Sequence, residues 1–404
     1  MEEWNIIKAY DYCYNVTDGT HDSPKQTEFG KYLITSKHIK DNRIDFESAY
    51  KISEDDYNKI ITRSKVDQWD IIISMIGAYC GFCCIESSKQ TDYAIKNVGL
   101  LKVGNELKCK WLYYYLTSPH GKQQLSKLRS GSSQPYISLG ALRNLDIPVP
   151  NENTMSDIVS VLSSLDSKIE LNRCINDNLE QQAQALFKSW FVDFEPFKDG
   201  KFVDSEMGMI PEGWKVVQLG DVTIQMKDRV GERSDVKVLS PVSTGELLLS
   251  EEYFTKQVYS EDISKYILVK PNMFAYNPTR VNIGSIGRNK NNFDGCVSPV
   301  YVVFSCEENY HYFFDLFRML PSFKEEVALR AIGGVRQTLK YSDLSMIKTI
   351  YPPLYIVLEF NKIMEKLLNI QKMTSMEILN LAEIRDTLLP RLMSGELKIN
   401  DLNC

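Results

Sequence analysis

The chain has 404 residues, which is too long for a single hydrophobic core and indicates two or more folded units. Its formal net charge is −6, from 47 Lys and Arg against 53 Asp and Glu, which excludes a protein that attracts nucleic acid through a positive field over its whole surface. The nine cysteines follow no regular spacing and no apolar run reaches the ~20 residues of a membrane helix, so we expect a cytoplasmic protein without a membrane segment.

A first module of mixed α and β structure is predicted for residues 1–153. Short apolar runs between turn residues, such as Trp69–Gly77, are typical of strands, and Lys110–Leu128 has a helical pattern. Pro148 and Pro150 then end the strand pattern and open a long helix.

This first long helix is predicted over residues 154–194, of which Met155–Phe191 contain neither Pro nor Gly. Apolar side chains recur there at steps of three and four residues and form a narrow seam. At 1.5 Å per residue the helix would be roughly 55 Å long, so its own module cannot cover the seam. The seam positions singled out here are Ile158, Leu165, Leu179, Leu186 and Trp190.

The second half of the chain has the same organisation. Pro299–Phe304 is predicted as a strand and Tyr310–Arg330 as a helix, and Pro352 and Pro353 precede a second long helix. The segments are a linker (195–212), a second mixed module (213–354), the second long helix (355–393) and a tail (394–404). The seam positions of the second helix are Phe360, Leu367, Leu381, Leu388 and Leu392.

An internal repeat relates the two halves. A shift of 202 residues superimposes Gly131–Pro150 on Gly333–Pro352 and continues without a gap through both long helices. The starts of the modules match at a shift of 210, where Trp4 corresponds to Trp214, so the first module is longer by about eight residues. The apolar residues correspond while the polar ones differ, which indicates one fold with two different surfaces.

The seams of the two helices predict that the helices pair with each other. We favour an antiparallel coiled coil, because it relates the two halves by an approximate two-fold axis. Asn172 and Thr374 occupy the same seam position in the two copies. Either they fix the register of the pair, as polar seam residues often do, or the position faces solvent.

Three segments carry a family resemblance. Ala185–Phe197 (ALFKSWFVDFEPF), Asp204–Val222 (DSEMGMIPEGWKVVQLGDV) and Arg385–Leu397 (RDTLLPRLMSGEL) resemble signature segments of the specificity subunits of type I restriction-modification enzymes. Asp18–Pro24 (DGTHDSP) and the loop that starts at Gly131 are also similar to that family. Between these segments the match is only to the general pattern.

The resemblance implies a non-catalytic subunit with two target-recognition domains separated by a pair of antiparallel helices. Each domain would read one part of a split double-stranded DNA sequence, and the helices would set the spacer. The implied partners are two methyltransferase subunits and two motor-nuclease restriction subunits, with S-adenosylmethionine, ATP and Mg²⁺ bound by those partners and none by this chain. The alternative function is a coiled-coil scaffold with two globular protein-binding domains.

The sequence gives no convincing catalytic motif of its own. Asn277-Pro-Thr-Arg280 lacks the second proline and the aromatic residue of an adenine methyltransferase motif, and no phosphate-binding loop of the G-x-x-x-x-G-K-[ST] type is present. Cys80 and Cys83 form a single C-x-x-C pair without two further metal ligands at suitable spacing. We therefore expect neither catalytic residues nor a metal site.

Local basic residues are the candidates for DNA contact. Each module is close to neutral, with 19 Lys and Arg against 18 Asp and Glu in residues 1–150 and 17 against 16 in 214–353. Small residues in the loops after 129 and 330 would let the backbone approach phosphates, and Arg or Gln can donate in pairs to base edges. A solvated loop with glycines for turning is the alternative. The candidates are Lys37, His38, Lys40, Arg43, Arg129, Ser130, Ser132, Gln134, Arg280, Arg288, Lys290, Arg330, Arg336 and Gln337.

Overall fold

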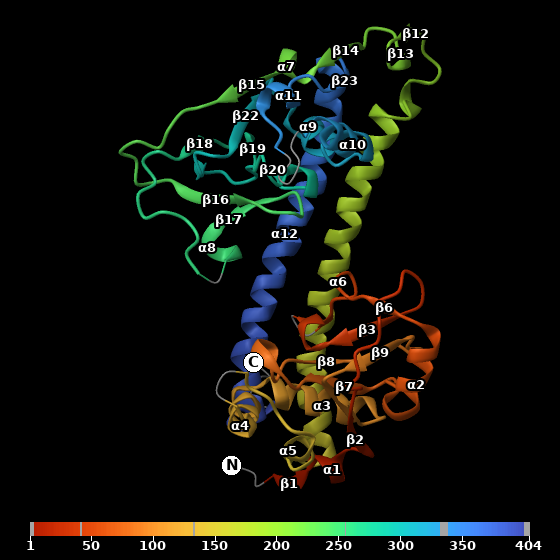
Figure 1. Cartoon of the computed structure of the whole chain (residues 1–404). Helices are drawn as coiled ribbons and strands as arrows, with labels where there is room; N and C mark the ends of the chain where they lie inside the picture. The colour runs from red at the N-terminus through yellow and green to blue at the C-terminus, as the bar shows by residue number, and fades with distance from the viewer. Residues whose placement is uncertain (1–3, 41–42, 132–133, 255, 332–337, 400–404) are drawn as a thin grey trace. The chain divides into compact units, whose positions relative to one another are not determined.

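The computed structural model describes residues 4–40, 43–131, 134–254, 256–331 and 338–399. It divides into two compact units, of which unit 1 contains residues 1–173 and 375–404 and unit 2 contains residues 174–374 (Figure 1). Two long helices, α6 (Glu152–Phe191) and α12 (Leu354–Met393), each contribute one part to unit 1 and the other part to unit 2. Each unit is therefore one module together with the start of one long helix and the end of the other.

The module of unit 1 contains a four-stranded antiparallel sheet. Its strands, in spatial order, are β2 (Asn15–Asp18), β10 (Val98–Lys102), β7 (Asp70–Ser74) and β8 (Cys83–Ile85). A second sheet pairs β3 (Lys31–Thr35) in parallel with β9 (Tyr93–Lys96) and antiparallel with β6 (Lys51–Ile52). Two short antiparallel pairs complete the strands: β1 (Asn5–Lys8) with β11 (Asp146–Val149), and β4 (Ile39–Lys40) with β5 (Arg43–Ile44).

The helices of this module are short. They are α1 (Ala9–Tyr12), α2 (Glu54–Ser64), α3 (Glu106–Thr117), α4 (Pro119–Leu128) and α5 (Leu139–Arg143), with single 3₁₀ turns at Ser36–His38 (η1) and Gly77–Tyr79 (η2).

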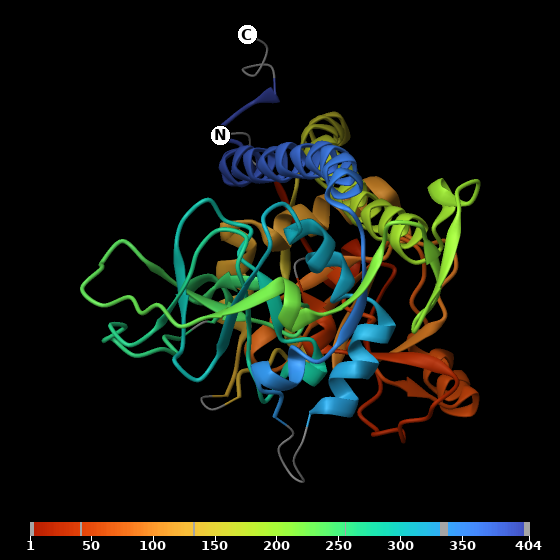
Figure 2. The same cartoon turned by 90° about the horizontal axis from the view of Figure 1, so that it is seen from above.

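Unit 2 repeats this arrangement. Its antiparallel sheet has the order β15 (Thr223–Met226), β22 (Val302–Cys306), β19 (Phe274–Tyr276) and β20 (Ile286–Arg288). Its second sheet has the order β17 (Leu247–Leu249), β16 (Lys237–Pro241), β21 (Gly295–Val297) and β18 (Ile267–Val269), with β16 and β21 parallel. Figure 2 shows these strands, green to teal, gathered on one side of the unit. The antiparallel pairs are β14 (Lys215–Gln218) with β23 (Lys348–Tyr351), and β12 (Phe202–Ser205) with β13 (Gly208–Pro211).

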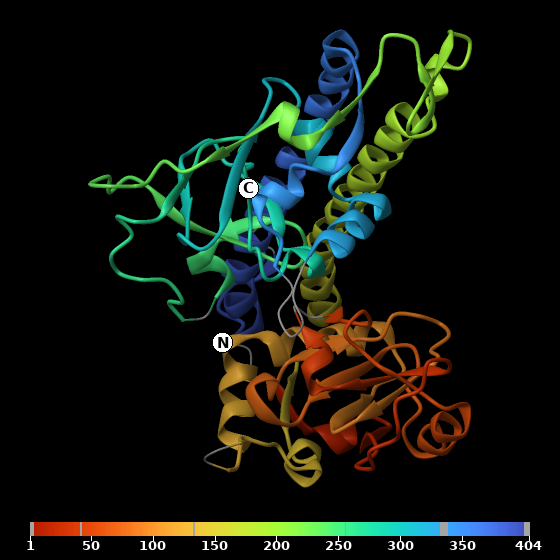
Figure 3. The same cartoon turned by 45° about the horizontal axis from the view of Figure 1, so that its top comes forward.

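The helices of unit 2 complete the correspondence. Figure 3 shows the two helices before β23, in lighter blue, alongside the green end of α6. The helices are α7 (Leu219–Val222), α8 (Ser250–Tyr253), α9 (His311–Phe317), α10 (Pro321–Arg330) and α11 (Tyr341–Leu344), with 3₁₀ turns at Glu195–Phe197 (η3) and Val281–Ile283 (η4).

The elements confirm the predicted repeat. Both long helices and the strands before them, β11 and β23, differ by 202 residues at each end, while β1 and β14 differ by 210. The extra length of the first module falls partly on α2, which has 11 residues where the second module has the four-residue α8. The mixed α and β fold class is likewise confirmed.

Two predicted helices are each divided in the structure. Lys110–Leu128 belongs to α3 and α4, which meet at Ser118, and Tyr310–Arg330 contains α9 and α10. In both modules the second helix starts with a proline, Pro119 or Pro321. Proline has no N–H to donate to the preceding turn, so it is favoured at a first helical position and interrupts a continuous helix.

Contacts within each unit show that α6 and α12 run antiparallel. In unit 1, Arg385 donates to Asp166 at 2.8 Å, and six residues further along α6 Asn172 donates to Glu377 at 2.8 Å, eight residues earlier along α12. In unit 2 the hydroxyl of Thr374 donates to Asn176. The predicted antiparallel pairing is therefore confirmed, while the two-fold axis concerns the placement of the two units and stays a prediction.

The polar seam position has the register role rather than the solvent-facing one. Asn172 is 1% exposed, and its amide is held by the carboxylate of Glu377, which also lies 3.6 Å from the ammonium of Lys168. Its counterpart Thr374 is half-buried. A buried amide needs a polar partner, so a shift of one helix along the other would leave Asn172 unpaired.

The apolar seam is wider near the helix ends than the sequence predicts, because each module packs against a second side of the helices. Among the predicted positions, Ile158, Leu179, Phe360 and Leu392 are buried, and the other six are half-buried: Leu165, Leu186, Trp190, Leu367, Leu381 and Leu388. Buried residues that the seam pattern missed are Leu162, Ala183, Phe187, Phe191, Val357, Met364 and Leu389.

Aromatic rings dominate the core of unit 2. Phe191 contacts Phe360 with ring centroids 4.9 Å apart and Phe313 at 5.2 Å, and it also lies 5.9 Å from Trp214. These contacts join α6, α12, α9 and the chain before β14 in one cluster. No helix among the described residues has the length and apolarity to cross a membrane.

We predict that Phe360→Ala lowers the free energy of unfolding by about 3–5 kcal/mol, because the ring is fully buried and its loss leaves a cavity. Urea denaturation followed by tryptophan fluorescence measures this, since Trp190 and Trp214 lie in the same cluster. Tyr355→Ala is the control, because that ring is on the same helix and 66% exposed. Equal losses in the two variants would contradict the assignment of Phe360 to the core.

Candidate nucleic-acid interface

In unit 1 the loop of candidate residues after α4 is bonded to the turn after β7. The Gly77 N–H donates to the Pro135 carbonyl at 2.8 Å, and the Ile137 N–H donates to the Met75 carbonyl at 2.9 Å. The guanidinium of Arg129 donates to the Cys80 carbonyl at 2.5 Å. These bonds hold loop and turn together as one surface, which we name loop cluster 1 (residues 75–82, 129–131 and 134–137).

The side chains of loop cluster 1 combine polar and aromatic groups. Arg129, Ser130 and Gln134 are exposed as predicted, while Ser132 lies outside the described residues. Three rings that the sequence analysis did not select are also exposed: Tyr79, Phe82 and Tyr136, at 36%, 49% and 46%. The signal for two of them was present, since Tyr79 and Phe82 flank Gly81, whose φ of 93° turns the chain at the surface.

Unit 2 has a loop cluster at the corresponding place. The Leu339 N–H donates to the Pro278 carbonyl at 3.0 Å, as Ile137 does to Met75 in unit 1. Asn277 shapes this turn, because its side-chain oxygen accepts from the Thr279 N–H at 3.1 Å and from the Thr279 hydroxyl at 2.9 Å. We name this surface loop cluster 2 (residues 277–280 and 338–342).

The predicted residues near loop cluster 2 have different placements. Arg280 is exposed on the turn, and Arg330 is half-buried and paired with Glu326 at 3.0 Å. Arg336 and Gln337 lie outside the described residues. Because Leu339 is bonded to the Pro278 turn, the end of the second candidate loop and Arg280 belong to one surface.

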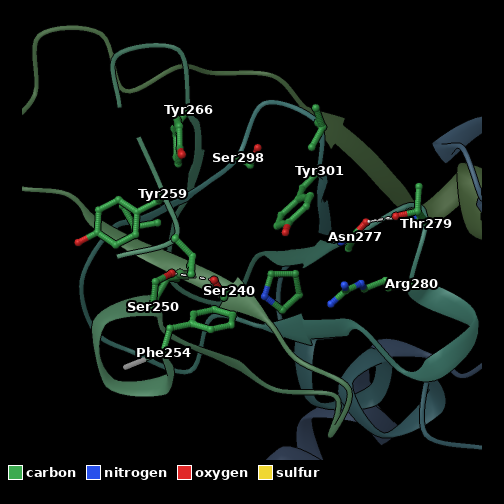
Figure 4. Close-up of a pocket in the computed structure, with 15 residues that line it drawn as sticks. Ser240, Ser250, Phe254, Tyr259, Tyr266, Asn277, Thr279, Arg280, Ser298 and Tyr301 are labelled. Atoms are coloured by element: carbon green, nitrogen blue, oxygen red, sulfur yellow. Dashed lines mark hydrogen bonds between the residues drawn. The ribbon is translucent and has the colours of Figure 1, made fainter. Parts of the chain in front are cut away.

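A cavity of about 560 Å³ opens beside Arg280 (Figure 4). Asn277, Thr279 and Arg280 line one side, Phe254, Tyr259 and Tyr266 line the other, and the ring of Tyr301 lies between them. Ser240 and Ser250, whose hydroxyls are 2.7 Å apart, line one side of the cavity, and Ser298 lies across from them near Tyr301 (Figure 4). The cavity therefore offers aromatic faces and hydrogen-bonding groups around one cation.

A second pocket continues this surface. It shares Asn277, Thr279 and Tyr301 with the first and adds Lys340 and Gln225. None of the residues that line either pocket is Asp or Glu. Arg280 and Lys340 are the charged residues among those that line the two pockets, and the amide, guanidinium and phenol groups there suit a polyanion with flat aromatic bases.

Arg288 is a correction to the predicted interface. Its side chain is 5% exposed, donates to Asp315 at 2.9 Å and to Asn272 at 2.6 Å, and stacks on the ring of Tyr312. Burial by itself raises the pKa of Asp315, but the charges of Arg318 and Arg288 outweigh it and hold this pKa below its ordinary value. Arg288 therefore stabilises the module, whereas Lys290, two residues later, is exposed.

His38 is the second correction. The side chain is 0% exposed, its Nδ1 accepts from the Thr35 N–H at 3.0 Å, and burial lowers its pKa. It cannot contact DNA from this position. Lys37 is exposed on the same 3₁₀ turn, Lys40 pairs with Asp45 at 2.8 Å, and Arg43 pairs with Glu170 of α6.

Cysteines and metal ligands do not form a site in the described part of the chain. There, no group of three or more His, Cys, Asp or Glu could hold a metal ion. Cys80, Cys83 and Cys84 are buried, and burial raises the pKa of Cys83 to about 12. These thiols pack as small apolar side chains.

Comparisons with known proteins agree with the two-module arrangement. Residues 1–181 match the family described as the type I restriction modification DNA specificity domain. The chain is 29% identical over 310 residues to the type I restriction enzyme MjaIX specificity subunit of Methanocaldococcus jannaschii, covering 72% of this chain and 70% of that protein. It is 26% identical over 342 residues to the HindI specificity subunit of Haemophilus influenzae, covering 68% and 74%.

Among solved structures, a type I restriction-modification S subunit from M. genitalium aligns over 96% of both chains with 16% identity and a TM-score of 0.49. The sequence relatives give no support to the alternative of a protein-binding scaffold. By the family match over residues 1–181 and by the two relatives, this chain is similar to the DNA specificity subunits of type I restriction-modification enzymes.

Proposed function

We propose that the protein directs a type I restriction-modification complex to a split DNA sequence, with one loop cluster reading each part. The observation that carries this proposal is the recurrence of the loop cluster. In both modules the same backbone contact ties a loop to a turn, by Ile137 to Met75 and by Leu339 to Pro278. The side chains nevertheless differ, with Tyr79 and Phe82 in one turn and Asn277 and Arg280 in the other.

The chemistry of these side chains suits base edges. Arginine donates in pairs to guanine, and Asn or Gln pairs with adenine, in the major groove. Arg280, Asn277 and Gln225 border the acid-free groove of unit 2, and Arg129 and Gln134 belong to loop cluster 1. Exposed Lys37, Lys40, Arg43 and Lys290 would contact phosphates, which position the protein without reading sequence.

Catalysis belongs to the partners in this proposal. Two methyltransferase subunits would bind S-adenosylmethionine, and two motor-nuclease subunits would bind ATP and Mg²⁺, while this chain binds none of them. Exposed apolar side chains on α12 support docking by a partner, because Ile370, Met373, Met376 and Leu379 are 46–71% exposed. The complex would act in the cytoplasm, where its DNA is.

The first expected outcome concerns the target. A cell that expresses this chain with its methyltransferase partner should methylate adenines in one split sequence, with an adenine in each part on opposite strands. Methylome sequencing measures this directly. A continuous target, or no target, would be incompatible with two reading modules.

Substitution in a loop cluster should change one part of the target only. Arg280→Ala should relax the base preference at one or two positions of one part, at a cost of about 1–3 kcal/mol on the native sequence, because the guanidinium no longer donates to a base. Methylation rates on duplexes with single base changes measure the effect. Gln134→Ala should act on the other part, and Lys324→Ala, an exposed cation on α10, should act on neither.

If Arg280→Ala and Gln134→Ala altered the same part of the target, the assignment of one module to each part would be wrong. An unchanged preference in both variants would remove the loop clusters from the interface.

The paired helices should act as a ruler for the unspecified spacer. Seven residues inserted near Leu179, matched by seven near Gln371 because both line one pocket of unit 2, would lengthen the pair by ~10 Å. At 3.4 Å per base pair this predicts a spacer longer by about three base pairs with both parts of the target unchanged. Methylome sequencing of the insertion variant measures it, and altered target bases with the original spacer would contradict a ruler.

A further inference from the structure

The segment Asp18–Pro24 belongs to neither loop cluster, yet the structure fixes it firmly at the end of β2. The Gly19 N–H donates to the Val98 carbonyl at 2.9 Å, and the Thr20 N–H donates to the Ile95 carbonyl at 3.0 Å. A Cβ on Gly19 would lie 2.3 Å from the Ile95 oxygen, so only glycine fits this close approach. The turn is therefore rigid, and so is whatever it presents to solvent.

Asp18 holds two exposed side chains at this turn. Its carboxylate is 6% exposed, accepts a hydrogen bond from Arg63 of α2, and lies 3.1 Å from Nε2 of His21. The side chains of Arg63 and His21 are 57% and 68% exposed. The bond between Asp18 and Arg63 is enough to join β2 to α2, and it does not require His21. The buried carboxylate of Asp18 therefore also orients the exposed side chains of Arg63 and His21.

The turn between β9 and β10 continues this cluster. Nδ1 of His21 lies 3.0 Å from the side-chain oxygen of Asn97, which has a left-handed φ of 55°. The ammonium of Lys96 donates to the Ser23 hydroxyl at 2.6 Å. Lys96 thus lies against the Asp18–Pro24 segment and is half-buried.

Lys37 joins the cluster from η1. The hydroxyl of Ser36 donates to the Asn97 carbonyl at 3.1 Å, which places the exposed Lys37 next to the turn. Arg63, Lys96 and Lys37 are therefore three permanent cations around the Asp18–Pro24 segment. Asp18, which pairs with Arg63, and Asp22 are the acids of this segment, so the three cations exceed them by one charge.

We propose that Lys37, Arg63 and Lys96, with His21, bind consecutive phosphates of the DNA backbone beside the part of the target that loop cluster 1 reads. The inference rests on the proposed function and adds a positioning site to it. Cations already held by Asp18 and Ser23 lose little side-chain freedom on binding a phosphate. Phosphate contacts carry no sequence information, so the cluster should contribute affinity without changing the target.

The test uses the complex of this chain with its methyltransferase subunit and two DNA duplexes. One duplex carries the target found by methylome sequencing, and the other has both parts scrambled. The variant His21→Gln with Arg63→Gln removes the guanidinium and the imidazole but leaves amide donors for Asp18. The measured quantity is the ratio of Kd at 200 mM salt to Kd at 50 mM salt.

Each phosphate contact contributes about 0.9 to the salt slope, so its loss should lower this ratio about 3.5-fold. The double variant should lower the ratio about 3.5-fold on both duplexes, because Arg63 is the permanent cation that it removes, with the methylated sequence unchanged. Lys96→Gln, which leaves the pairs of Asp18 intact, should lower it about 3.5-fold by itself and covers the case in which the double variant does not fold.

Lys89→Gln is the matched control. Lys89 is an exposed cation that lies before the first residue of β9, whereas Lys96 is the last residue of this strand. Ratios that match the wild type in Lys96→Gln and in a folded double variant would overturn the proposal, as would a loss confined to the target duplex, which would indicate base reading. A wild-type complex that methylates no split sequence would instead refute the proposed function, and the scrambled duplex would still report on the cluster.

Discussion

Pairing between the two long helices is the interaction on which the rest of the structure depends. Each helix has 40 residues and is ~60 Å long, far more than its own module covers. In unit 1, Ile158 of α6 shares a core with Leu392 of α12, and in unit 2 Phe187 of α6 shares one with Phe360. Neither module has a complete core without the end of the other module's helix.

The features that the sequence predicted are those in which local chemistry decides the outcome. Prolines and a sustained apolar period define the long helices to within three residues at each end. The 202-residue repeat survives because core positions must stay apolar while the surface changes. The run Trp69–Gly77, predicted as a strand, contains β7, because a run of β-branched side chains is typical of a buried strand.

The errors concern residues whose surroundings come from distant parts of the chain. Arg288, among glycines and asparagines, has the sequence context of an exposed loop, and only the packing of Asp315 and Tyr312 of α9 makes it buried. Exposed Tyr79 and Phe82 are the converse, since isolated aromatic residues are normally assigned to a core. No local pattern reports such contacts.

The bonds from Ile137 to Met75 and from Leu339 to Pro278 use backbone atoms alone, so exposed side chains such as Gln134 and Arg280 can change without breaking these bonds.

Unit 1 also has a consequence for the order of synthesis. It is completed by residues from 375 onward, which leave the ribosome after those of unit 2, and Gly395 lies beside the ring of Trp4. Unit 2, residues 174–374, has all of its chain available earlier. The module that is synthesised first therefore completes its core after the second module. Its apolar surface stays uncovered until Leu389, Leu392 and Met393 have been synthesised. Premature termination would accordingly damage the beginning of the protein before it damaged the middle.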